Sequence, residues 1–275
     1  MCQSIITADT LLTMDGVRLN LLRAGAVGSA RSEKTVFVLI PGWCMPAAIW
    51  RDTMLALAPD SQVIALDPRG QGASEIPERG YHIDQRADDI AQCVARSIDS
   101  SAKVILVGWS LGALEALHYV RRHGETKLKG LVLVDSSVGE APAIPAAQTF
   151  RADLKLDRRG AMERFVRQMF HSPRAQAEIS GLLESALRMP LEASLDIFPS
   201  HLPREHWRGI ARALRVPLLY AVTPQFAEQA ENLRKARPAT QIELFADAGH
   251  ALFVDAPERF NRMLSGFVDR LNDKI

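Results

Sequence analysis

Gly108-Trp109-Ser110-Leu111-Gly112 is the stretch of sequence that decides the fold. It follows the apolar run 104–107 directly, and a helical pattern begins at its end. A G-x-S-x-G turn between a strand and a helix is typical of a nucleophile elbow, in which glycines relieve crowding on either side of a strained central residue. The turn projects the serine hydroxyl and leaves the next N–H unpaired at the helix N-terminus. We therefore predict Ser110 as a nucleophile and the Leu111 amide as an oxyanion donor.

Apolar runs of strand length alternate with helical patterns through most of the chain. Runs such as 36–40 and 131–134 are almost continuously apolar, which is typical of parallel strands covered on both faces. The predicted strands are residues 17–22, 35–40, 62–66, 103–107, 131–134, 217–222 and 241–245, and the clearest helices are 83–98, 111–122 and 257–271. This alternation predicts an α/β fold with a mostly parallel central sheet flanked by helices.

The alternation stops between residues 139 and 215, where no strand pattern occurs. We predict that this segment is a helical lid, inserted after the strand that ends at residue 134, and that residues 1–138 and 216–275 form the core. Met162, Phe165 and Met169 recur there at helical spacing, which favours ordinary packing, although such side chains can also line a pocket. Together with Trp109 and Trp207, they are our candidates for the substrate pocket.

A serine hydroxyl needs an adjacent base, most often an imidazole. Of the 7 histidines, His250 stands out because it ends the turn Asp247-Ala248-Gly249-His250 after a predicted strand. A third group must orient the imidazole. Asp135 is favoured because it closes the strand 131–134, and parallel strand ends converge at one sheet edge. Glu228 is the alternative acid, and a chain without an effective acid is the remaining possibility.

Two further motifs complete a resemblance to a known family. Pro41-Gly42-Trp43 follows the strand 35–40, and the run 67–74, Asp-Pro-Arg-Gly-Gln-Gly-Ala-Ser, follows the strand 62–66. With the elbow and the late Ala-Gly-His, they make the chain similar to the α/β-hydrolase superfamily, and in particular to small serine carboxylesterases, from about residue 12 to residue 275.

The resemblance carries expectations about individual residues. It implies that the Trp43 amide is the second oxyanion donor, and that Asp67 and Arg69 pair within a structural loop. Pro41 departs from the family, which usually has histidine there, so we expect a loop of similar shape with altered hydrogen bonding. The acid also departs, because no aspartate lies between Asp196 and Asp247, where the family usually places it.

The favoured function is hydrolysis of a small carboxylic ester, or a related acyl bond, through an acyl-enzyme on Ser110. One alternative is a non-hydrolytic enzyme of the same fold, such as a C–C hydrolase, a lyase or a cofactor-free ring-cleaving dioxygenase. The acid at Asp135 and the Trp43-Cys44 pair resemble features of those dioxygenases. The other alternative is a non-catalytic protein that binds a ligand, because fold does not determine function.

Composition limits the classes of partner and the kind of protein that we expect. Its 275 residues are 47% apolar, enough for one large core, and the net charge of +1 gives no basic field for nucleic acid. No apolar run approaches the roughly 20 residues of a membrane span, and the start lacks a secretory pattern. Cys2, Cys44 and Cys93 are too sparse for a disulfide framework or metal cluster. We expect a soluble cytoplasmic protein with a small-molecule substrate and no metal or cofactor, and we leave open a homo-oligomer.

Overall fold

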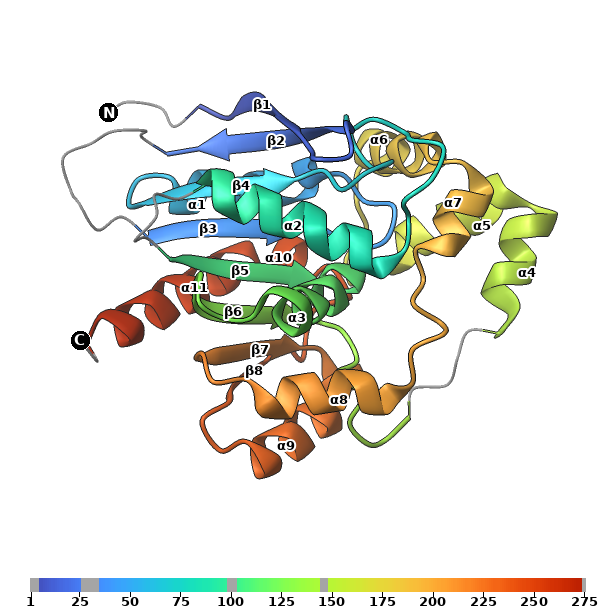
Figure 1. Ribbon diagram of the computed structural model, residues 1–275. Coiled ribbons are helices and arrows are strands. Elements are labelled where there is room, and N and C mark those ends of the chain that lie inside the picture. The colour runs from blue at the N-terminus through green and yellow to red at the C-terminus, as the bar shows by residue number, and fades with distance from the viewer. Residues whose placement is uncertain (1–4, 26–34, 98–102, 144–147, 274–275) are drawn as a thin grey trace.

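The computed structural model describes residues 5–25, 35–97, 103–143 and 148–273. An eight-stranded sheet runs through its centre in the order β1-β2-β4-β3-β5-β6-β7-β8 (Figure 1). The strands are β1 (Thr7–Leu12), β2 (Arg18–Ala24), β3 (Thr35–Ile40), β4 (Ser61–Leu66), β5 (Val104–Trp109), β6 (Leu128–Val134), β7 (Leu218–Val222) and β8 (Gln241–Leu244). β2 pairs antiparallel with β1 and β4, and all other pairs are parallel. The predicted α/β fold is confirmed.

Helices cover both faces of this sheet (Figure 1). Among the described residues the α-helices are α1 (Arg51–Leu57), α2 (Ile83–Ser97), α3 (Leu111–His123), α4 (Gln148–Leu156), α5 (Arg158–Gln168), α6 (Gln176–Arg188), α7 (Leu191–Asp196), α8 (Arg204–Ala213), α9 (Ala227–Ala236), α10 (Leu252–Asp255) and α11 (Pro257–Asn272). Two short 3₁₀ helices, η1 (Ala47–Trp50) and η2 (Pro224–Phe226), precede α1 and α9. One face carries α2, α3, α8 and α9, and the other carries α1, α10 and α11.

The strand β3 shows why its residues 36–40 are all apolar. Phe37 and Leu39 belong to the core on the α1 and α11 side of the sheet, while Val36, Val38 and Ile40 belong to the core on the α2 and α3 side. Successive side chains of a strand point to opposite faces, so a strand covered on both faces must be apolar at every position. The two cores meet only through the sheet, which makes the parallel strands a rigid base for the loops at their ends.

The edge strand β1 was missed by sequence reasoning. Five of its six residues are exposed or half-buried, and only Leu11 is buried. It is held mainly by its antiparallel ladder with β2. Hydrophobic periodicity identifies strands through their burial, so an edge strand that buries one side chain leaves little signal.

The described part of the segment between β6 and β7 contains helices joined by turns and loops, and no strand. α4, α5, α6 and α7 gather beyond the carboxyl ends of the parallel strands, whereas α8 packs along α3 in the layer that covers the sheet (Figure 1). α8 also contributes Trp207, Ile210 and Ala211 to the core on that face. We therefore propose that the lid consists of α4 to α7, and that α8 belongs to the core.

Some sequence-based expectations fall on residues outside the described ranges, namely Cys2 and residue 98 at the end of the predicted helix 83–98. Cys44 and Cys93 are both buried and form no disulfide. No helix among the described residues combines the length and the apolar character that crossing a bilayer requires.

Candidate active site

The elbow at Ser110 is crowded as its sequence predicts. Ser110 lies between β5 and α3 with φ at 55°, in the left-handed region that side chains rarely adopt. A Cβ at Gly108 would lie 2.3 Å from the carbonyl oxygen of Gly112, and one at Gly112 would lie 2.6 Å from the carbonyl oxygens of Ile40 and Pro41. Only glycine fits either position, so α3 can pack directly against the end of β3.

A continuous set of contacts joins the elbow to His250. The Ser110 N–H donates to the carbonyl oxygen of Val134 at 2.9 Å, which places Ser110 beside the end of β6. The next residue, Asp135, is fully buried and also has a positive φ, 43°. Its Oδ2 lies 2.7 Å from His250 Nδ1, and its Oδ1 accepts the Thr223 N–H at 2.7 Å. Both carboxylate oxygens are therefore used, and the backbone bond holds the carboxylate toward the imidazole.

Hydrogen bonds to the elbow and to the helical insertion hold the loop that carries His250. The indole of Trp109 donates its Nε1–H to the carbonyl oxygen of His250 at 2.8 Å. The centroids of the indole and of the His250 imidazole lie 5.2 Å apart. From the helical insertion, the carbonyl oxygen of Met169 accepts the Ala251 N–H at 2.8 Å. A Cβ at Gly249 would also lie 2.8 Å from that oxygen. Glycine is needed before His250 because the insertion approaches so closely.

The remaining nitrogen of His250 is open. Its side chain is 25% exposed, and Nε2 makes no hydrogen bond to any described residue. Glu228, the alternative acid, is exposed on α9, and no hydrogen bond or ion pair among the described residues joins it to His250. The acid next to the imidazole is Asp135.

The loop after β3 lies against the elbow. A Cβ at Gly42 would approach the Ser110 Cβ to 3.3 Å, so the two backbones are in close contact. The N–H groups of Trp43 and Leu111 donate to no acceptor within the described residues. The Trp43 indole is anchored elsewhere, because its Nε1–H donates to the carbonyl oxygen of Ser194 in α7 at 2.6 Å. Two unpaired amides thus flank the serine.

A cavity of about 550 Å³ opens above Ser110. Trp43 and Leu111 line it beside the serine, and the helices of the insertion supply much of its wall. Trp43 packs at 5.1 to 5.4 Å, between ring centroids, from three aromatic side chains that also line the cavity. These are Phe150, Phe165 and Phe198.

The five side chains proposed for the pocket lie in different places. Phe165 is among the residues that line the cavity above Ser110. Met162 and Met169 are buried in the core beneath the insertion, at 0% and 1% exposure, and Trp109 supports the His250 loop. Trp207 lies on the other face of the sheet, where it contacts two histidines of the α3–α8 seam. A helical stripe cannot reveal from sequence which side chains face a cavity and which face a neighbouring helix.

The loop after β4 braces the loop after β3. Asp67 accepts the N–H of Ala47 at 2.5 Å and that of Ala73 at 2.9 Å, and burial raises the pKa of its carboxyl. Arg69 pairs with Asp89 of α2, with its Nε 2.7 Å from Oδ2. The expectation that Asp67 and Arg69 pair within the loop was wrong as a mutual pair, because Asp67 accepts backbone N–H groups and the Asn20 amide while Arg69 pairs with Asp89. The expected structural role stands for both.

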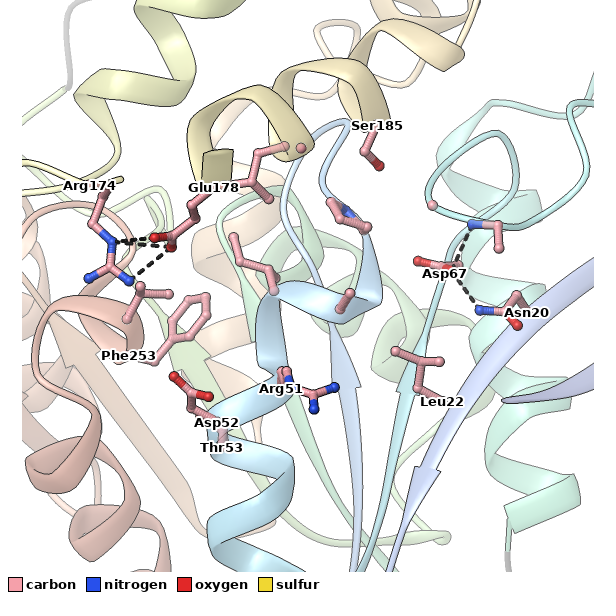
Figure 2. Close-up of a pocket in the computed structure, with 18 of the residues that line it drawn as sticks. Asn20, Leu22, Arg51, Asp52, Thr53, Asp67, Arg174, Glu178, Ser185 and Phe253 are labelled. Atoms are coloured by element: carbon pink, nitrogen blue, oxygen red, sulfur yellow. Dashed lines mark hydrogen bonds and ion pairs between the residues drawn. The ribbon is translucent and has the colours of Figure 1, made fainter. Parts of the chain in front are cut away.

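A second cavity, of about 560 Å³, lies between the insertion and η1 (Figure 2). Asp67, held by Asn20 and a backbone N–H, lies at one side of it, and the ion pair between Arg174 and Glu178 lies at the other. Ser185 also lines this cavity, but no histidine or cysteine does. It therefore has no serine or threonine beside an imidazole, which distinguishes it from the cavity above Ser110.

The thiol that follows Trp43 is unsuited to nucleophilic chemistry. Cys44 follows Trp43 but is buried, and burial raises the pKa of its thiol to about 12, so it stays protonated at neutral pH. Among the described residues, no three histidine, cysteine, aspartate or glutamate side chains gather as a metal site.

Comparison with known proteins agrees with this geometry. Residues 37–263 match the model of the alpha/beta hydrolase family. A pimeloyl-[acyl-carrier protein] methyl ester esterase of Vibrio cholerae is 30% identical, over 85% of this chain and 94% of that protein, and its counterpart in Vibrio vulnificus is 29% identical over the same shares. The crystal structure of a putative aryl esterase from Burkholderia cenocepacia superposes with a TM-score of 0.82, at 26% identity, over 97% of this chain and all of that one.

The family model matches far more than half of the sequence, and the similar proteins described above are named as esterases. The sequence-based prediction of a hydrolase similar to small esterases is therefore confirmed at the level of the family. The chain belongs to the alpha/beta hydrolase family.

Proposed function

We propose that the protein is a serine hydrolase that cleaves a carboxylic ester through an acyl-enzyme on Ser110, with His250 as the general base and Asp135 as the orienting acid. The observation that carries this proposal is the 2.7 Å contact between Asp135 Oδ2 and His250 Nδ1, placed beside a strained nucleophile elbow. The contact selects the tautomer with its proton on Nδ1, which leaves Nε2 as the basic nitrogen.

In this proposal, the chain supplies a side chain for each bond change and proton transfer of the reaction. His250 Nε2 accepts the proton as Ser110 Oγ attacks the ester carbonyl, and the buried Asp135 carboxylate stabilises the imidazolium. The tetrahedral intermediate collapses, the C–O bond to the alcohol breaks, and His250 returns the proton to the leaving alkoxide. Water, activated by the same nitrogen, attacks the acyl-enzyme and releases the carboxylic acid and free Ser110.

The unpaired amides of Trp43 and Leu111 support an oxyanion hole in this proposal. Both flank Ser110, and neither has a competing acceptor among the described residues. An amide directed at the developing oxyanion stabilises the transition state more than the ground state, by roughly 3 kcal/mol for each donor. Backbone donors are fixed before the substrate arrives, so they need no reorganisation during the reaction.

The cavity favours an ester with an apolar acyl or aryl group. Its aromatic walls at Phe150, Phe165 and Phe198 can bury such a group beside Ser110. The curated relatives are named for methyl ester hydrolysis on a pimeloyl group. Methyl esters of acyl chains are therefore the first natural class to test, alongside aryl esters.

The decisive experiment compares turnover of p-nitrophenyl butyrate by the wild-type protein and by Ser110→Ala. We expect the variant to lose about 10⁴-fold or more in kcat, because it removes the attacking atom. A fluorophosphonate probe should label the wild type and not the variant. Equal turnover by the two proteins would reject the proposal, and tight ligand binding without turnover or labelling would favour a non-catalytic role.

The position of Phe165 allows the acyl site to be tested separately. We expect Phe165→Ala to lower kcat/KM for p-nitrophenyl hexanoate by about tenfold and for the acetate by less than about threefold, because only the longer chain reaches the aromatic wall. Met162→Ala is the matched control, since it removes a buried side chain of the same helix that does not line the cavity. An equal loss for both esters with Phe165→Ala would place the acyl group elsewhere.

A non-hydrolytic reaction remains the alternative, supported by the position of the acid after β6. Oxygen consumption with a hydroxyquinolone substrate, measured with the same wild-type and Ser110→Ala proteins, distinguishes the two reactions. Consumption of oxygen without ester turnover would favour the dioxygenase.

A further inference from the structure

The loop of residues 42–45, which carries Trp43, takes side-chain hydrogen bonds from Gln71. The Gln71 amide donates both of its N–H groups, one to the carbonyl oxygen of Gly42 at 3.0 Å and one to that of Met45 at 2.8 Å. These two carbonyls bracket the Trp43-Cys44 peptide. Pro41, just before the loop, has neither a backbone N–H nor a polar side chain with which to brace it.

A buried ion pair sets the orientation of the Gln71 amide. Arg86 of α2 donates from Nη2 to Gln71 Oε1 at 2.9 Å and pairs through Nε with Glu115 of α3. Because the amide oxygen faces a guanidinium, the NH₂ group must face the two carbonyls of the loop. The three side chains are 0%, 1% and 1% exposed, so water cannot replace their hydrogen bonds.

The network reaches both halves of the proposed oxyanion hole. Glu115 lies one turn along the helix that begins at Leu111, and Gln71 holds the loop that contains Trp43. A single chain of buried polar contacts, Glu115 to Arg86 to Gln71, therefore connects the element of one donor to the element of the other.

We propose that Gln71 is a positioning residue that holds the Trp43 amide toward the oxyanion, and that Arg86 and Glu115 hold Gln71. The role follows from its two donors, its fixed orientation and its burial. It rests on the proposed function, because an amide needs this positioning only if an oxyanion forms at Ser110.

The test uses two substitutions at one position. Gln71→Leu removes both donors, and Gln71→Glu keeps the shape but directs a carboxylate oxygen at the loop carbonyls. We expect each to lower kcat for p-nitrophenyl butyrate by about 10- to 100-fold while KM changes by less than about threefold, because the oxyanion exists only in the transition state. Fluorophosphonate labelling of Ser110 should slow in parallel. If Gln71→Leu does not fold, Gln71→Glu carries the test.

Gln229→Leu is the matched control, because Gln229 is also 0% exposed and bonds loop backbone, donating to the carbonyl oxygen of Pro142 at 2.8 Å and accepting from the Val138 N–H. If Gln71 had only a structural role, both Leu variants would unfold at a lower urea midpoint than the wild type. Their kcat per folded molecule would then equal that of the wild type. That result, or unchanged labelling of Gln71→Glu, would overturn the inference. Absence of labelling in the wild type would instead overturn the proposed function, so the two failures are distinguishable.

Discussion

Two of the histidine–aspartate pairs among the described residues have contacts of similar length but very different surroundings. His250 Nδ1 lies 2.7 Å from Asp135, and His118 Nε2 lies 2.6 Å from Asp84. In the first pair the acid is 1% exposed and the imidazole 25% exposed, while in the second the acid is 53% exposed and the imidazole 9%. The first pair therefore combines a buried carboxylate with a partly exposed imidazole, and the second presents a carboxylate to solvent.

The second nitrogen of each imidazole completes the contrast. His118 Nδ1 lies 3.2 Å from His206 Nε2, so both ring nitrogens of His118 have partners. Nε2 of His250 has none among the described residues. A short contact between an imidazole and a carboxylate is therefore insufficient for catalysis, because a general base also needs an open nitrogen beside a nucleophile. The comparison therefore distinguishes the proposed reaction centre at His250 from the packing contact at His118, where α3 meets α8.

The largest expected effect comes from replacing each histidine by glutamine. His250→Gln should lower kcat for p-nitrophenyl butyrate by about 10⁴-fold, because it removes the base, whereas His118→Gln should stay within about threefold of wild type. Steady-state kinetics on both folded proteins measures the difference. A comparable loss from His118→Gln would mean that the seam takes part in the reaction.

Replacing the acids gives the next effect. Asp135→Asn should lower kcat by about 10³- to 10⁴-fold, because an amide no longer stabilises the imidazolium or selects its tautomer. Asp84→Asn and Glu228→Gln should each leave kcat within about threefold, because Asp84 and Glu228 are exposed and neither contacts His250 among the described residues. If Glu228→Gln abolished turnover while Asp135→Asn kept it, the acid would have been assigned to the wrong residue.

The smallest effect concerns stability and pH. Burial first, and then the neighbouring charge of His118, lower the pKa of His206 below its usual 6.5. The unfolded chain then binds more protons than the folded one near that pH, so His206 contributes stability above about pH 6.5 that is lost as the pH falls through its folded pKa. His206→Gln should show a smaller drop in urea midpoint between pH 7.5 and 5.5 than wild type, with turnover at pH 7.5 unchanged. An identical drop would show that His206 does not titrate in this range.

The sequence was most informative where local sterics dictate the residue type. The elbow glycines at 108 and 112 and the continuous apolar strands follow from short-range rules, and the predicted strand ends match the structure to within three residues. The acid was harder, because Asp135 reaches His250 only through the convergence of β6 with the loop after β8. That convergence depends on strand order, which β6 pairing with β7 and β7 with β8 determine.

The remaining features lay beyond sequence reasoning for physical reasons. In the sequence, Gln71 is one residue of a turn-rich motif. Its proposed role depends on the carbonyl oxygens of Met45 and Gly42, which lie 26 and 29 residues earlier in the chain. The partner of Arg69 could not be read from the motif either, because Asp89 is supplied by α2. Trp207 has the same apolar character as the pocket residues, and only the docking of α8 on α3 places it on the opposite face.

Three residues other than glycine have positive φ among the described residues, and all three lie around the elbow: Cys44, Ser110 and Asp135. A left-handed backbone at such residues costs of order 1 to 3 kcal/mol each. Attempts to make the protein more heat-tolerant by relaxing unfavourable torsions would therefore be drawn to the very positions that the chemistry uses. Cys44 is the one position of the three whose side chain has no proposed part in the reaction, so it is where the energetic cost of a left-handed backbone can be studied without removing a reacting group.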